Sequence, residues 1–110
     1  MKLHNLRKAV PYFNLLIKTH HTKRGKLLHL LPEHVAQTII ELMYNIVNER
    51  IPLRQPTHFD TLKQNKARVL QIVEPKSPKT QLRALYKQNG GFLGAILPIL
   101  VSVVGSLLGR

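Results

Sequence analysis

The side chains that could carry chemistry are histidines and cations, because the chain has no cysteine and only five acidic residues against seventeen Lys and Arg. Without cysteine there is no disulfide, no thiolate metal site and no thiol nucleophile. The sequence contains no acidic pair in register, no nucleophile beside a base and no glycine-rich phosphate loop. We therefore do not expect an enzyme, and we expect no cofactor.

Six histidines form the first candidate group. His20 and His21 could approach His29 or His34, but no acidic or cysteine ligand lies at a spacing that would complete a metal site. We therefore expect no bound metal. The histidines would instead gain up to six positive charges when the pH falls to that of an endosome. This predicts that any membrane disruption changes between neutral and endosomal pH.

The cations predict an anionic partner. The formal net charge is +12, and a field of this size attracts nucleic acid, an acidic membrane or an acidic protein. The densest groups, which we predict to contact phosphates, are Lys23, Arg24, Lys26, Lys63, Lys66, Arg68, Lys79, Arg83 and Lys87. No zinc-finger spacing, helix-turn-helix pattern or aromatic stacking platform is present, so we predict non-specific nucleic-acid binding. The alternative is a basic surface that contacts only water.

The elements that must position these groups are expected to be helices. Apolar residues recur at helical spacing in 3–22, 32–50, 57–73 and 77–88, and proline or glycine separates several of these stretches. Residues 20–26 are expected to be a connection. This pattern predicts an all-α fold with a small basic helical domain over 1–91, a glycine hinge and an apolar C-terminal helix over 92–110.

The third of these stretches has a capping signal of its own. Thr57 followed by Asp60 approximates a capping box, so Thr57 is the expected N-cap. The apolar stripe expected to be buried behind it is Phe59, Leu62, Val69, Leu70 and Val73. In the last stretch, Ser77 is the expected N-cap and Pro78 the expected first helical residue.

Residues 92–109 contain no charged residue. As a helix this stretch would be about 27 Å long, slightly less than a ~30 Å hydrocarbon core, so a membrane span is marginal. We predict membrane contact through Phe92, Leu93, Ile96, Leu97, Leu100, Val104, Leu107 and Leu108. The small residues fall on one helix face, which predicts helix packing and self-association through Gly94, Pro98, Ser102, Gly105 and Gly109. The alternative is a buried core helix in a small bundle.

The junction before this tail is formed by Gln88, Asn89, Gly90, Gly91 and Phe92. Asn and Gly suit a helix end and a hinge. The same residues also match the preference of adenovirus-type maturation proteases for a Met, Ile, Leu, Asn or Gln followed by any residue and two glycines. That interpretation predicts cleavage between Gly91 and Phe92.

The layout resembles the short basic proteins of Maverick/Polinton elements and adintoviruses. The shared order is a basic N-terminal helical region, an amphipathic helix ending near 45–53, a Lys/Arg/Gln-rich region, and residues 87–93 leading into a Leu/Ile/Val/Gly tail. Such elements encode a capsid and a Gly-Gly-directed maturation protease. Their small proteins are similar to adenovirus core and membrane-lytic proteins. The resemblance implies a virion component that meets viral nucleic acid or the inner capsid surface, a maturation protease and membrane lipids.

The sequence therefore predicts a virion-associated minor core or capsid protein precursor. It would bind nucleic acid through 1–91 in the host nucleus during assembly. Its C-terminal peptide, freed by cleavage after Gly91, would disrupt the endosomal membrane during entry. Two alternatives remain open: a cellular helical interaction module whose tail docks into a partner or its own dimer, and a tail-anchored membrane protein.

Overall fold

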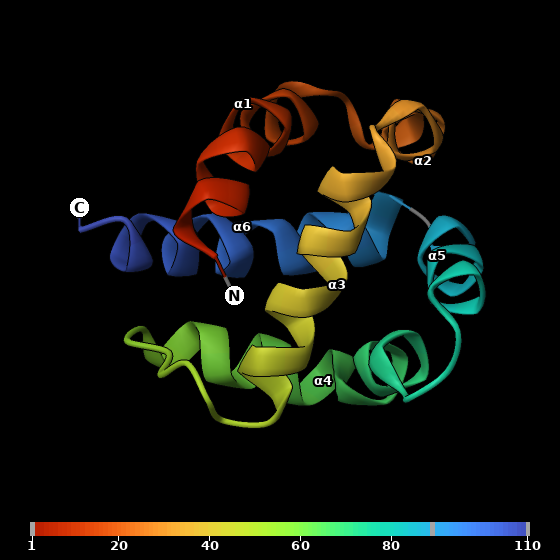
Figure 1. Cartoon of the computed structure of the whole chain (residues 1–110). Coiled ribbons are helices and arrows are strands. Elements are labelled where there is room, and N and C mark those ends of the chain that lie inside the picture. The colour runs from red at the N-terminus through yellow and green to blue at the C-terminus, as the bar shows by residue number, and fades with distance from the viewer. Residues whose placement is uncertain (1, 89, 110) are drawn as a thin grey trace.

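The computed structural model describes residues 2–88 and 90–109, and the fold is all-α. Six helices and no strand occur in these ranges (Figure 1). The helices are α1 (Leu3–Lys18), α2 (His21–Leu30), α3 (Glu33–Val47), α4 (Pro56–Val73), α5 (Pro78–Tyr86) and α6 (Gly90–Leu107). The prediction of an all-α fold is confirmed.

Helix α2 occupies residues that the sequence assigned to a connection. The ring nitrogen Nδ1 of His20 accepts a hydrogen bond from the backbone N–H of Thr22 at 3.4 Å, which caps the helix. Leu28 is fully buried and anchors the helix to the core. The prediction of a connection over 20–26 is wrong because His20 supplies the cap and one buried leucine supplies the packing.

The start of α4 also differs from the expectation. The helix begins at Pro56, with Gln55 as the N-cap residue, so Thr57 lies inside the first turn. Proline fits the first helical position because its φ angle is already helical and its missing N–H would have no partner there. The predicted buried stripe is correct for Val69 and Val73, whereas Phe59 and Leu70 are exposed.

The start of α5 is as predicted. Ser77 is the N-cap, and its side-chain oxygen accepts from the backbone N–H of Thr80 at 3.3 Å. Pro78 is the first helical residue. Two glutamine bonds then fix the turn before this helix, since Nε2 of Gln81 donates to the carbonyl oxygens of Val73 and Glu74.

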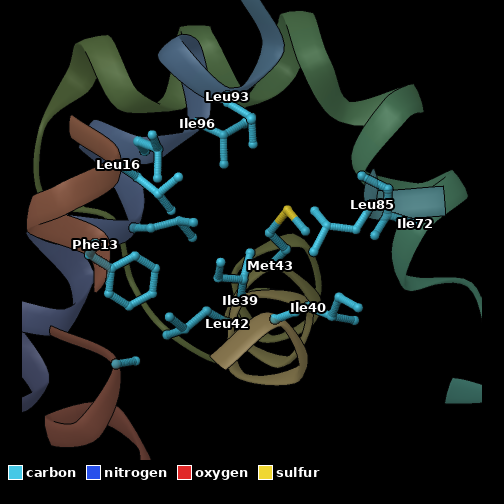
Figure 2. Close-up of a cluster of buried hydrophobic side chains, with 14 of the residues drawn as sticks. Phe13, Leu16, Ile39, Ile40, Leu42, Met43, Ile72, Leu85, Leu93 and Ile96 are labelled. Carbon is cyan, nitrogen blue, oxygen red and sulfur yellow. The ribbon is translucent and has the colours of Figure 1, made fainter. Parts of the chain in front are cut away.

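Helix α6 lies at the centre of the bundle. It crosses the middle of the molecule in Figure 1 and contacts α1, α2, α3 and α4. Figure 2 shows side chains from α1, α3 and α6 pointing into one apolar cluster; the labelled ones are Phe13, Leu16, Ile39, Ile40, Leu42, Met43, Leu93 and Ile96. The least polar segment of the chain therefore packs in the core.

The glycines at the junction belong to α6 itself. Gly90 and Gly91 are the first two residues of this helix. Asn89, the other part of the predicted hinge, lies outside the described residues, so the hinge stays a prediction.

Candidate nucleic-acid interface

The cationic side chains lie on the surface. Fifteen of the sixteen Lys and Arg residues within the described ranges are exposed, and they are distributed over α1, α2, α4, α5 and the connections. Helices α3 and α6 carry none. The two helices that supply most of the buried apolar side chains therefore carry no cation.

The cationic residues of α5 form a stripe and are the most regularly spaced cationic group. Lys79, Arg83 and Lys87 are exposed, while Leu82 and Leu85 on the opposite side are buried. Helix α5 also contacts α2, where the ring of Tyr86 lies 4.8 Å from the ring of His29 between centroids. A packed inner face and a capped start hold the three cations on one rigid outer face, where they can meet successive phosphates.

The predicted group on α4 lies on the helix that precedes that stripe. Lys63, Lys66 and Arg68 are exposed and lie ten, seven and five residues before Val73, the last residue of α4. At 1.5 Å per residue, these positions are about 15, 10 and 8 Å from that end of the helix. Arg68 is therefore the member of the α4 group nearest to the end of the helix that leads to α5.

Arg24, in the predicted α2 group, is engaged within the fold, unlike its exposed neighbours Lys23 and Lys26. Its Nε donates to the carbonyl oxygen of Leu16 at 3.0 Å, and its Nη2 donates to that of Ile17 at 3.2 Å. These carbonyls are in the last turn of α1, where few backbone donors of the helix remain; the carbonyl oxygen of Leu16 also accepts from the backbone N–H of Thr19 at 3.3 Å. Arg24 therefore joins α2 to α1 as a structural cap.

Gly94 makes room for this cap. A Cβ atom at Gly94 would lie 2.9 Å from Nη1 of Arg24, closer than side chains normally approach. The sequence pattern predicted that Gly94 packs against another helix through its small size. In the structure, the group that comes close to Gly94 is the guanidinium of Arg24. Of the remaining members of the predicted helix-packing face, Pro98 and Gly109 are exposed, and Ser102 and Gly105 are half-buried.

The side chains predicted to contact a membrane are mostly buried. Phe92, Leu93, Ile96, Leu97, Leu100 and Val104 lie in the core, whereas Leu107 is exposed and Leu108 is half-buried. Among the described residues, no helix has by itself the length and apolar character needed to cross a membrane, although α5 and α6 together, as a bent pair, meet the length and composition test. The prediction of membrane contact remains a prediction.

The predicted cleavage site lies at a helix start. The backbone N–H of Gln88 donates to the carbonyl oxygen of Leu85, and its side-chain Nε2 donates to that of Ala84, both at 3.0 Å. Gly91 is exposed, but Phe92 is only 2% exposed. A protease that binds its substrate in an extended form would have to unwind the first turn of α6.

The histidines do not converge on one point. The rings of His20 and His21 lie 4.3 Å apart between centroids. No group of three or more His, Cys, Asp or Glu able to hold a metal is present in the part of the chain that the structure describes.

One surface feature was missed at the level of sequence. A groove of about 480 Å³ runs between the end of α3, the connection 48–55 and the first half of α4. Its lining includes Ile51, Leu53, Phe59 and Leu62. Two features of the sequence could have indicated this groove. Ile51, Pro52 and Leu53 are apolar although they lie in a connection, and Phe59, which helical periodicity assigned to the core, follows them.

Comparison with known proteins gives no relative: no family model matches the chain, and no curated protein or solved structure is significantly similar to it.

Proposed function

We propose that the protein binds nucleic acid without sequence preference, as a minor core or capsid component of a virion. The observation that supports this proposal is the exposed cationic side chains, held on rigid helices whose inner faces are packed. Lysine and arginine presented in this way neutralise phosphates and release counterions, and they read no base edges.

The α5 stripe is the proposed centre of this surface. Lys79, Arg83 and Lys87 recur every four residues, so they project from one side of the helix. Lys26 on the neighbouring α2 adds a further exposed cation. Four to six phosphate contacts would make the logarithm of the affinity fall with the logarithm of salt concentration at a slope of roughly −4 to −5.

Titration of fluorescent duplexes with the full chain tests this proposal. Two duplexes of equal length and unrelated sequence should bind with the same affinity, and binding should show the salt slope given above. A strong preference for one duplex would contradict non-specific binding. A slope near zero would show that phosphates are not the ligand.

Membrane disruption by α6 is a second candidate, favoured by an eighteen-residue helix without charge. In the fold, eight large apolar side chains of α6 are buried. At 1.5–3 kcal/mol each, their burial is worth about 12–24 kcal/mol, which is comparable to or larger than the 5–15 kcal/mol total stability of an ordinary domain. Helix α6 therefore cannot leave the core while the other helices stay folded, unless a bilayer replaces the core contacts.

This second candidate requires a membrane activity that depends on unfolding. A 92–110 peptide should release dye from liposomes, whereas the folded chain should not until denaturant or acid opens it. An inert peptide would contradict the lytic function and favour an interaction module in which α6 serves only as the core.

A further inference from the structure

The groove between α3 and α4 has an uneven polarity along its α4 wall. Phe59, Leu62, Lys63 and Lys66 line it at helical spacings of three and four residues, so they share one face of α4. Two apolar side chains come first and two ammonium groups follow toward the middle of the helix. Ligands with an apolar chain and an anionic end have the matching polarity.

The rest of the groove completes an apolar bed. Ile46 is buried beneath it, and Ile51, Leu53 and Leu62 are half-buried around it. Phe59 is 55% exposed, although Val69, Ile72 and Val73 of the same helix are in the core. Covering Phe59 would remove apolar surface from water, and this provides a driving force for a ligand.

The connection that forms one wall of the groove is held in an unusual conformation. Glu49 follows α3 with φ 57°, in the left-handed region where glycine is normally found. The backbone N–H of Glu49 donates to the carbonyl oxygen of Ile46, and that of Arg50 donates to the carbonyl oxygen of Asn45. These two bonds close the end of α3, and the connection that follows leads to α4 (Figure 1, the yellow-green segment). Ile51, Pro52 and Leu53 of this connection line the groove.

We propose that this groove binds a single-chain anionic amphipath, with the hydrocarbon chain against Phe59, Leu62 and Leu53 and the anionic head group at Lys63 and Lys66. The volume of about 480 Å³ falls within the range of roughly 300–1,000 Å³ typical of small-molecule sites. Glu49 is the one acidic side chain in the lining, and it lies on the α3 side, away from the two lysines in sequence. A carboxylate or a phosphate head group satisfies the same requirement.

The test uses the full chain and three probes with the same ten-carbon chain, all kept below their micelle concentrations. Decanoate and decyl phosphate should bind with one-to-one stoichiometry by calorimetry and shift the backbone amide signals of 46–66. Decanol, which lacks the charge, should bind about tenfold more weakly, the combined effect of two solvent-screened ion pairs. Equal affinity for decanol, or shifts located elsewhere, would overturn the proposal.

Two variants and a matched control locate the two ends of the ligand. Phe59→Ala should weaken all three probes roughly tenfold, because it removes the chain contact. The double variant Lys63→Gln with Lys66→Gln should lower the affinity of the two anions to that of decanol and leave decanol unchanged. Lys8→Gln with Lys18→Gln removes the same charge from exposed positions on α1 and should bind all probes as the parent does.

Other outcomes overturn the assignment. If the control variant loses as much anion affinity as the groove variant, the effect is one of net charge, and the site is wrong. If sedimentation reveals a dimer that Phe59→Ala abolishes, and no probe binds, the groove accommodates a second copy of the chain instead. Phe59, Lys63 and Lys66 are exposed, so circular dichroism should confirm that these variants remain folded.

Discussion

Helices α5 and α6 follow one another in the chain and use their surfaces in opposite ways. The nine residues of α5 bury Leu82 and Leu85 and present cations on the other side. The eighteen residues of α6 contain no charge and supply eight large side chains to the core. A chain with a net charge of +12 can form a compact fold because its charge and its apolar surface are concentrated in different helices. The following predictions test that division.

The largest effect is expected from removing the core helix. A chain ending at Gly91 loses about 12–24 kcal/mol of apolar burial, an amount comparable to or larger than the whole stability of an ordinary domain, and should not fold. Circular dichroism and urea titration should show a loss of cooperative unfolding. A control chain ending at Leu108 retains α6 and should unfold cooperatively. A folded 1–91 would show that the basic helices form a domain without α6.

A single deletion of core volume gives the next largest effect. Leu97 is 1% exposed, and Leu97→Ala should lower the free energy of unfolding by about 2–5 kcal/mol through lost burial and a residual cavity. Leu107 in the same helix is 36% exposed, so Leu107→Ala should change the free energy of unfolding much less. Equal losses would mean that α6 is not anchored through the face described here.

Variants that lack the cations of α5 or of α4 should differ from each other in nucleic-acid binding and not in their free energy of unfolding. Replacing Lys79, Arg83 and Lys87 by Gln should make the salt slope of duplex binding shallower by roughly three, since each phosphate contact contributes about one. The equivalent triple replacement of Lys63, Lys66 and Arg68 removes the same charge from α4. If the two triple variants lose the same slope, phosphate contacts are spread over the surface rather than centred on α5.

The Arg24 cap, which joins α2 to α1 beside Gly94 of α6, predicts a smaller difference in stability between two glycine variants. Gly105→Ala, with open space at the Cβ position, should stabilise the protein by about 0.5–1 kcal/mol, because alanine is the better helix former. Gly94→Ala should gain less or destabilise, since it displaces Arg24 from the carbonyls of α1, a loss of about 1 kcal/mol. Thermal unfolding of both variants measures the difference, and identical shifts would argue against the cap.

The end of α3 supplies an effect of similar size. Glu49 has a positive φ angle, so Glu49→Gly should stabilise the protein by about 1 kcal/mol by removing left-handed backbone strain. A destabilised variant would mean that the glutamate side chain contributes more than its conformation costs. Chemical denaturation is precise enough to measure either sign.

The sequence predicted the helical class because its apolar spacing is local information. Ser77 and Pro78 mark the start of α5 in the same local way, and the structure confirms them. By contrast, α2 depends on a histidine cap and on one buried leucine, neither of which leaves a recognisable pattern in a stretch rich in cations.

The sequence predicted the charge of the candidate surface, but not which cations stay exposed and which bond to other helices. Spacing alone placed Lys79, Arg83 and Lys87 on one face, and all three are exposed. Arg24 was grouped with them because a segment rich in lysine and arginine gives no sign that one member caps the preceding helix. Nor does the sequence show that Gly94, seventy residues later, lies beside Arg24. The groove beside Phe59 was missed because exposure depends on which helix lies opposite, and that is set by the tertiary fold.

The order of the elements has a consequence for how the chain acquires its structure. The helix that fills the centre is the last of the six, and α1, its first partner, is the first of them. Contacts between such distant segments slow folding, because a long loop must close before they form. On a translating ribosome, the face of α1 that packs against α6 emerges long before residues 92–108, whereas α3 meets α1, α4 and α5 before α6 is made. The nascent chain therefore carries an apolar face on α1 that is covered only after α6 has been made.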